Sequence, residues 1–348
     1  MNKLMKPFSK KPKQNSKENS QLAKITNSTL EAEREEILNN GRKFKYPVQY
    51  SKRRLVAVTV IIAAIVALAS GILLWRQLYI AQNTGTLIYR ISTVLPLPVA
   101  NVDGENALYS DYLADYRANM NLSQSKAGML ELIKDENTRS NNYKKQAMDN
   151  VIRNTYALKI AHEKNITVSD EEINEVLHQQ RIVNGVEMSE AAFNRLIETN
   201  YGLSPSEYRR IFTELPLIRK KVAASIDSKA SNLKDEISKF LKENNNDFAK
   251  IAENFQNQNV EVGASGTVNL SNVDGGKAEA AVKLNTGQVS EAFVSKSGDG
   301  YYFVKLIAKN DKELSYEYIK ISFTALEEQI KNLESEGKIH KYIKIEEQ

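Results

Sequence analysis

Few residues in this chain have the types and spacing that catalysis or metal binding needs. The chain has no cysteine, which excludes disulfides, thiol nucleophiles and cysteine-based metal sites. Its three histidines, His162, His178 and His340, stand alone, and none belongs to a zinc-binding H-E-x-x-H motif. The glycine-rich runs 274–276 and 297–300 do not fit the phosphate-binding pattern G-x-x-x-x-G-K-[ST] and are typical of turns. The sequence therefore predicts no metal site and no cofactor.

One segment departs from an otherwise polar chain, whose mean hydropathy is −0.46. Residues 55–75 (LVAVTVIIAAIVALASGILLW) carry no charge and, at ~1.5 Å per residue, are long enough as a helix to cross ~30 Å of hydrocarbon. Basic residues 52–54 precede this segment, and Trp75 and Arg76 suit its far interface. A secretory signal would lie within the first ~30 residues. The segment is predicted to be a single transmembrane helix, and residues 76–98 a linker.

Charge is divided unequally around this apolar segment. Residues 1–54 hold 14 Lys and Arg against 5 Asp and Glu, whereas residues 77–348 hold 33 against 38. The positive-inside rule therefore places the basic tail in the cytoplasm and the rest outside it. We expect the tail to be disordered over 1–27, to form a short helix ending at Gly41, and to contact the anionic headgroups of the lipid bilayer. Because the basic excess belongs to the tail alone, the pI near 8.9 does not indicate a nucleic-acid partner.

The part beyond the linker divides into three segments. Residues 99–225 are predicted to be helical, because Ser169 and Ser204 each begin a capping box with glutamate three residues later. Between 226 and 310, helical segments are followed by glycine-punctuated strands, which indicates an α+β domain. Residues 311–348 are predicted to be an αβ extension, whose amphipathic helix is suited to packing on the helical domain.

Three stretches of the helical region resemble SurA-type chaperone domains. The first, VANVDGE at 99–105, is similar to the element that leads into the family's first helix. Residues 146–177, with the joint ITVSDEEI, resemble its two central helices, and residues 191–222, with YGLSPSEYRR, resemble the helices that follow. The stretches occur in the family's order. The resemblance implies a helical chaperone domain that binds unfolded polypeptides.

The region that follows resembles a parvulin prolyl-isomerase domain. The similar segments are DFAKIAENF at 247–255, LNTGQVSEAF at 284–293 and GDGYYFVKL at 298–306. A helical chaperone domain followed by a parvulin domain resembles the architecture of the PrsA, PpiD and SurA foldases. The fold implied is a single transmembrane helix, an α chaperone domain and an α+β parvulin-like domain.

The residues at the parvulin catalytic positions differ from those of the family. Its members resemble one another in a histidine on the first strand, an acid or thiol on a second strand and a histidine on the last. Counting back without gaps from Gly287 places the second position at Ala264, while the histidines correspond to Ser225, loosely, and Tyr302. The phenylalanine of the proline pocket corresponds to Lys277, which would put a hydrated charge in an apolar wall. The resemblance therefore implies a parvulin fold that has lost its isomerase machinery.

Together these features predict a membrane-anchored, extracytoplasmic foldase-type chaperone. Its partners would be unfolded or newly exported polypeptides, recognised weakly through apolar grooves. The sequence leaves two alternatives open. One is an active peptidyl-prolyl cis-trans isomerase with a rearranged site, and the other is a non-catalytic envelope scaffold that holds one specific partner.

Overall fold

The computed structural model describes residues 26–45, 52–125, 136–183, 185–255 and 258–346. The chain divides into two compact units, Met1–Ile72 and Leu73–Gln348. Nearly all of the segment 1–27, predicted to be disordered, lies outside the described residues. Helix α1 (Asn27–Lys45) runs through Gly41, where the sequence predicted its end. A glycine inside a helix costs only about 1 kcal/mol, so flanking helix-forming residues carry the helix past it.

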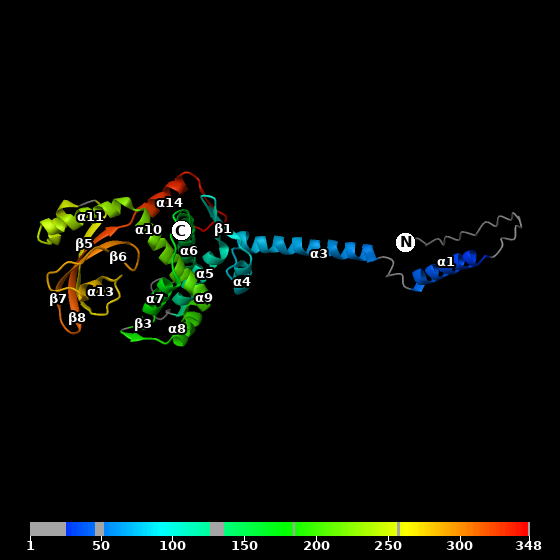
Figure 1. Ribbon diagram of the computed structural model, residues 1–348, viewed down its shortest axis with the longest axis horizontal. Coiled ribbons are helices and arrows are strands. Elements are labelled where there is room, and N and C mark those ends of the chain that lie inside the picture. The colour runs from blue at the N-terminus through cyan, green and yellow to red at the C-terminus, as the bar shows by residue number, and fades with distance from the viewer. Residues whose placement is uncertain (1–25, 46–51, 126–135, 184, 256–257, 347–348) are drawn as a thin grey trace, which may run out of the picture. The chain divides into compact units, whose positions relative to one another are not determined.

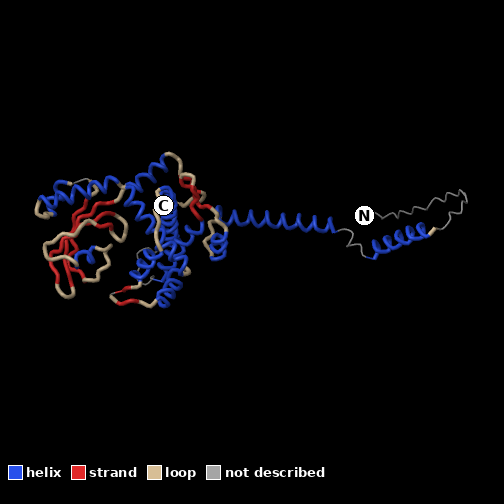
Figure 2. Tube along the Cα trace, viewed as in Figure 1, coloured by secondary structure: helices blue, strands red, loops and turns tan. Residues whose placement is uncertain are grey.

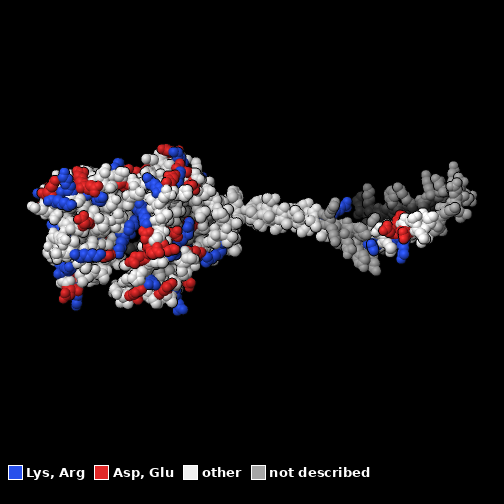
Figure 3. Space-filling model, viewed as in Figure 1, with Lys and Arg blue, Asp and Glu red and all other residues white. Residues whose placement is uncertain are grey.

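After three basic residues at its start, helix α3 (Lys52–Trp75) is apolar on every side. It continues into a π-helical turn, Arg76–Ile80, and the helix from Arg54 to Ile80 is long and apolar enough to cross a membrane. Its most apolar stretch is not buried against the rest of the protein. In Figure 3 the shaft of this helix shows no acidic or basic side chains.

The second unit begins with a helical domain (Figures 1 and 2). Its elements are α4 (Thr86–Val94), β1 (Pro98–Val102), β2 (Glu105–Leu108), α5 (Tyr109–Ser125), α6 (Glu136–Glu163), α7 (Asp170–Gln180), β3 (Ile182–Val183), β4 (Val186–Glu187), α8 (Glu190–Leu196), α9 (Pro205–Tyr208) and α10 (Leu215–Ile226). The predicted capping boxes are confirmed, with Ser169 beginning α7 and Ser204 beginning α9. π-Helical turns at Ile197–Tyr201 and Arg209–Glu214 extend α8 and α9.

Residues 76–98 are not a linker, contrary to the sequence prediction. Leu78 and Tyr89 are each only 1% exposed and, with Ile88, belong to the core of the helical domain. Of these, Ile88 and Tyr89 belong to α4, in which Ser92 is also buried. The prediction failed because nine residues make too few turns for a helical period to stand out.

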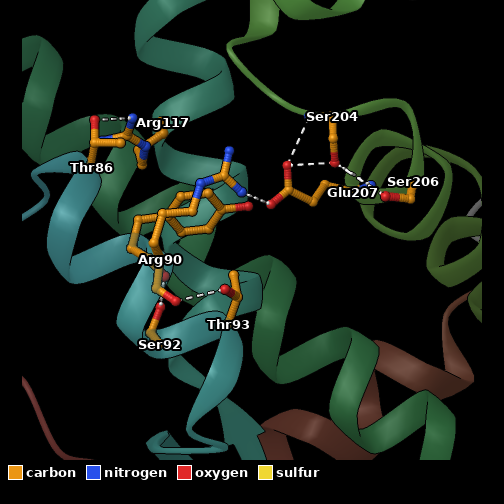
Figure 4. A network of polar contacts seen from close by, with 9 residues as sticks. Thr86, Arg90, Ser92, Thr93, Arg117, Ser204, Ser206 and Glu207 are labelled. Carbon is orange, nitrogen blue, oxygen red and sulfur yellow. Dashed lines mark hydrogen bonds and ion pairs between the residues drawn. The ribbon is translucent and has the colours of Figure 1, made fainter.

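Polar contacts fix α4 to the helices around it (Figure 4). The Arg90 guanidinium binds the Glu207 carboxylate at the start of α9, at 2.6 Å. From α5, Arg117 donates to the Thr86 hydroxyl at 3.0 Å. Both guanidinium groups lie over the ring of Tyr89, at 5.2 and 5.3 Å from its centroid. Helix α4 is therefore held from two sides.

A sheet domain follows the helical domain. Its elements are α11 (Ser228–Glu243), α12 (Phe248–Asn254), β5 (Val260–Asn269), α13 (Lys277–Val282), β6 (Phe293–Val294), β7 (Gly300–Lys309) and β8 (Glu313–Ser322). The antiparallel sheet has the order β5-β8-β7-β6. Helices α11 and α12 contribute to the core on one face, and α13 packs on the other. Since β8 lies between β5 and β7, this domain extends beyond residue 310, where the sequence had placed its end.

The end of the chain returns to the helical domain. Leu326 and Ile330 of α14 (Ala325–Ser335) lie in the same buried core as residues of α6 and α10 (Figure 1). Strand β9 (Ile339–Lys341) pairs antiparallel with β1, in the sheet order β2-β1-β9. The helical domain is thus built from two segments of sequence that flank the sheet domain.

Candidate functional site

The structure brings together two of the four positions singled out in the sequence. Lys277 begins α13 and Tyr302 lies on β7, and their side chains meet on one face of the sheet. Ser225 lies on α10 and is exposed, so its assignment to a first strand is wrong. Ala264 lies on β5 opposite Glu317 of β8. Because side chains alternate along a strand, Ala264 points away from the face that holds Tyr302.

Lys277, Tyr302 and Tyr318 form what we call the tyrosine cluster. The two rings lie 6.0 Å apart between centroids, and the Lys277 Nζ atom lies 4.8 Å from the Tyr302 centroid and 5.4 Å from that of Tyr318. The same ammonium donates a hydrogen bond to the Asp274 carbonyl oxygen at 2.5 Å. The expected hydrated charge is therefore a cation packed on aromatic faces.

The tyrosine cluster packs closely against residues of β5 and β6. Gly263 on β5 faces Tyr318, and a Cβ atom there would lie 2.5 Å from the phenol oxygen, so only glycine leaves room for the ring. Phe293 stacks on Tyr302 at 6.2 Å. The space beside Tyr302 is therefore occupied by Lys277, Tyr318 and Phe293.

Asp299 organises the polar edge of the tyrosine cluster. One carboxylate oxygen accepts hydrogen bonds from the hydroxyls of Ser295 and Ser297. The other accepts the Tyr302 hydroxyl at 2.9 Å and pairs with the Lys320 ammonium at 2.7 Å. Partial burial by itself raises the pKa of the carboxyl group, but these donors, led by Lys320, outweigh it and hold the pKa well below its usual value. The Tyr302 hydroxyl is therefore committed to a structural hydrogen bond.

This arrangement predicts a pH-dependent loss of stability in Asp299→Asn. Because folding lowers the pKa of Asp299, its contribution is complete above about pH 5 and is lost progressively as the pH falls from about 4 towards the lowered pKa of the folded state. Urea unfolding at pH 7 should show a lower midpoint for the variant than for the wild type, and the gap should narrow on acidification. Asp311→Asn, in an exposed turn, is the matched control. A gap that stays constant between pH 7 and pH 3 would contradict the assignment.

A second candidate site is a groove in the helical domain, which we call the α7–α9 groove. It encloses about 600 Å³. Its apolar lining comes from Leu177 on α7, Phe193 on α8, Ile197 at the start of the following π-helical turn and Pro205 on α9. An aromatic cluster supports it from behind, since the Phe193 and Tyr208 rings lie 5.9 Å apart. A lining of this kind accepts apolar side chains of varied shape.

Hydrogen-bond donors stand at the rim of the α7–α9 groove. Arg209 donates to the Asn174 side chain at 2.9 Å, and Arg181 pairs with Glu187 of β4 at 2.7 Å. The buried Arg181 Nε atom has no acceptor within the part of the chain that the structure describes. Each guanidinium group has further N–H donors besides these, which can bind the backbone carbonyl groups of an extended peptide. The groove thus combines an apolar floor with polar groups that do not require one particular sequence.

Sequence reasoning missed Tyr318, Asp299 and the α7–α9 groove. The alternation in SYEYIKI carried a signal, because it places Tyr316 and Tyr318 on one face of a strand. Ser295, Ser297 and Tyr302 are near Asp299 in sequence, but Lys320 comes from another strand. The groove residues come from separate elements, and no local pattern links them.

Comparison with known proteins identifies one region of the chain. The family model for the SurA-like N-terminal domain matches residues 48–222, slightly more than half of the sequence. The match includes α3 and the helical domain as far as α10, and it ends before the sheet domain. No curated protein matches the chain.

Proposed function

Because the chain belongs to the SurA-like N-terminal domain family, we propose that it is an extracytoplasmic chaperone that α3 anchors to the membrane. Its clients are unfolded segments of newly exported proteins. The observation that carries this proposal is the α7–α9 groove, which lies within residues matched by the family. An unfolded chain offers the apolar side chains and free backbone carbonyl groups that this groove is suited to bind.

Anchoring is supported by the length and apolar surface of the helix Arg54–Ile80 and by the charge difference across it. With the basic tail in the cytoplasm, the helical and sheet domains lie outside. Binding of an unfolded client through one apolar groove is weak, and the membrane anchor offsets this low affinity. It keeps the domain near the place where exported chains emerge and raises their effective concentration.

The sheet domain, in this proposal, is a parvulin-like domain without isomerase activity. Catalysis of prolyl isomerisation needs a dry pocket that grips the ring and stabilises the twisted bond more than the planar one. Here the space beside Tyr302 is occupied by Lys277, Tyr318 and Phe293, with the Tyr302 hydroxyl bound to Asp299. Groove binding in the helical domain needs only apolar area and is unaffected by that loss.

One experiment on the purified full chain in detergent micelles tests both halves of the proposal. The chain should slow the aggregation of a chemically unfolded, unrelated protein. It should not accelerate cis-trans conversion of a short X-Pro peptide beyond the uncatalysed time of about tens to hundreds of seconds. Leu177→Ser should weaken the protection, because it places a hydroxyl in the groove floor.

The matched control is Ile307→Ser, which removes an exposed aliphatic side chain from β7 of the sheet domain and should leave protection unchanged. An equal loss of protection against aggregation in both variants would show that the α7–α9 groove is not the client-binding site. Isomerase activity that disappears in Tyr302→Phe would show an active, rearranged site. A chain that ignores unrelated clients is a scaffold.

A further inference from the structure

Helix α4 carries an apolar stripe that the protein itself does not cover. Leu87 and Val94, two turns apart, are 74% and 79% exposed, and Leu95 directly after the helix is 42% exposed. Ile91 lies between them and is half-buried. These four residues share one side of the helix at helical spacing, and we call them the α4 stripe. Exposure of this kind usually marks a contact surface.

The position of this stripe is fixed close to the end of the apolar helix. Leu78, in the π-helical turn that ends this helix, is buried in the domain core, and its carbonyl oxygen accepts the Tyr109 hydroxyl at 2.6 Å. The Tyr79 hydroxyl donates to the Pro98 carbonyl oxygen at 2.8 Å. The helical domain therefore begins within the last turn of the helix.

Only five residues lie between Ile80 and the first residue of α4, Thr86. At ~3.5 Å per residue even an extended chain would place α4 within about 20 Å of the helix end. The ion pair with Glu207 and the bonds from Arg117 hold α4 there (Figure 4). The stripe is therefore carried at a set distance from the point where the helix leaves the hydrocarbon.

We propose that the α4 stripe inserts into the headgroup region of the outer leaflet and docks the helical domain flat against the bilayer. This inference rests on the proposed membrane anchoring. The exit turn has interfacial character, with Trp75 54% exposed and followed by Arg76 and Tyr79. An exposed aliphatic face beside such a turn belongs to the same interfacial belt. In this proposal the helical domain contacts the bilayer through α4 as well as through the apolar helix.

The chain is well suited to a direct test, because it has no cysteine and a single tryptophan, Trp75. Single variants Leu87→Cys and Val94→Cys carry an environment-sensitive fluorophore, and Val273→Cys, 93% exposed in the sheet domain, is the control. The full chain is reconstituted in phosphatidylcholine–phosphatidylglycerol vesicles with a nitroxide near the lipid headgroup. The lipid nitroxide should quench most of the fluorescence of the labels at 87 and 94. The label at 273 should be quenched only by iodide in the aqueous phase.

Quenching of the intrinsic fluorescence of Trp75 distinguishes failure of the docking proposal from failure of the proposed membrane anchoring. If Trp75 is quenched by lipid nitroxide while the labels at 87 and 94 behave like that at 273, anchoring holds and the docking proposal is wrong. If neither Trp75 nor the labels are quenched, the anchoring fails and docking fails with it. Labels at 87 and 94 that are shielded from iodide without quenching by lipid would show that a second copy of the chain covers the stripe, which also overturns the proposal.

Discussion

Replacing both Leu326 and Ile330 by alanine is expected to lower the free energy of unfolding of the helical domain by about 5 kcal/mol, since each buried Leu or Ile lost costs roughly 2–5 kcal/mol. Both residues are in α14, after the sheet domain in sequence, yet they lie 5% and 9% exposed in the helical core. The Arg153 and Glu327 side chains pair at 2.7 Å across the same contact. Urea unfolding, followed by a probe attached to α6, measures the effect.

The control for this prediction is Lys331→Ala, on the exposed side of α14, which should change stability little. A double variant whose helical domain unfolds at the wild-type urea concentration would show that α14 does not contribute to that core. If only the sheet domain is destabilised, α14 packs with the sheet domain in solution.

Asp227→Ala is expected to be the most damaging single substitution outside the apolar core. The Asp227 carboxylate is 2% exposed and accepts the backbone N–H of Ala230 at 2.9 Å, which caps α11. Its second oxygen accepts the N–H groups of Thr324 at 2.7 Å and Ala325 at 3.1 Å, at the start of α14. The Asp227 side chain thus links the start of α11 to the start of α14, the two places where the chain passes between the helical domain and the sheet domain.

Loss of this carboxylate removes two helix caps and leaves buried N–H groups without acceptors, at a cost of about 3 kcal/mol. Thermal unfolding of Asp227→Ala should show the loss, and small-angle scattering should show a wider range of separations between the domains. Asp235→Ala changes a largely exposed aspartate on α11. This control variant should change neither the melting temperature nor the scattering. Identical melting and scattering in both variants would exclude Asp227 as the junction.

Local signals in the sequence were sufficient for much of the helical domain. The boxes at Ser169 and Ser204 were found because a cap involves residues only three positions apart. Helix α4 was missed because its buried face has few residues, and tertiary contacts with Arg117 and Glu207 decide its structure. The helix was therefore mistaken for a connecting segment.

The sheet domain shows where sequence comparison without gaps fails. Strand β8 lies between β5 and β7, so the residue beside Tyr302 comes from the end of the domain, Tyr318, and not from its start. Counting backwards along the chain led to Ala264, which points away from Tyr302, and the looser correspondence for the first histidine led to Ser225, on a helix. Pairing between strands far apart in sequence is set by the whole sheet, and no local pattern reports it.

The return of β9 to β1 governs the order in which this protein matures. In the proposed topology β1 is exported early and β9 last, so β1 must wait for almost the entire chain before its partner arrives. The sheet domain, whose strands all lie between β5 and β8, is complete sooner. The inserted domain therefore folds first and its host closes last. Until then one edge of β1 is unpaired and open to other strands, so the incomplete helical domain is exposed to pairing with another chain at this stage.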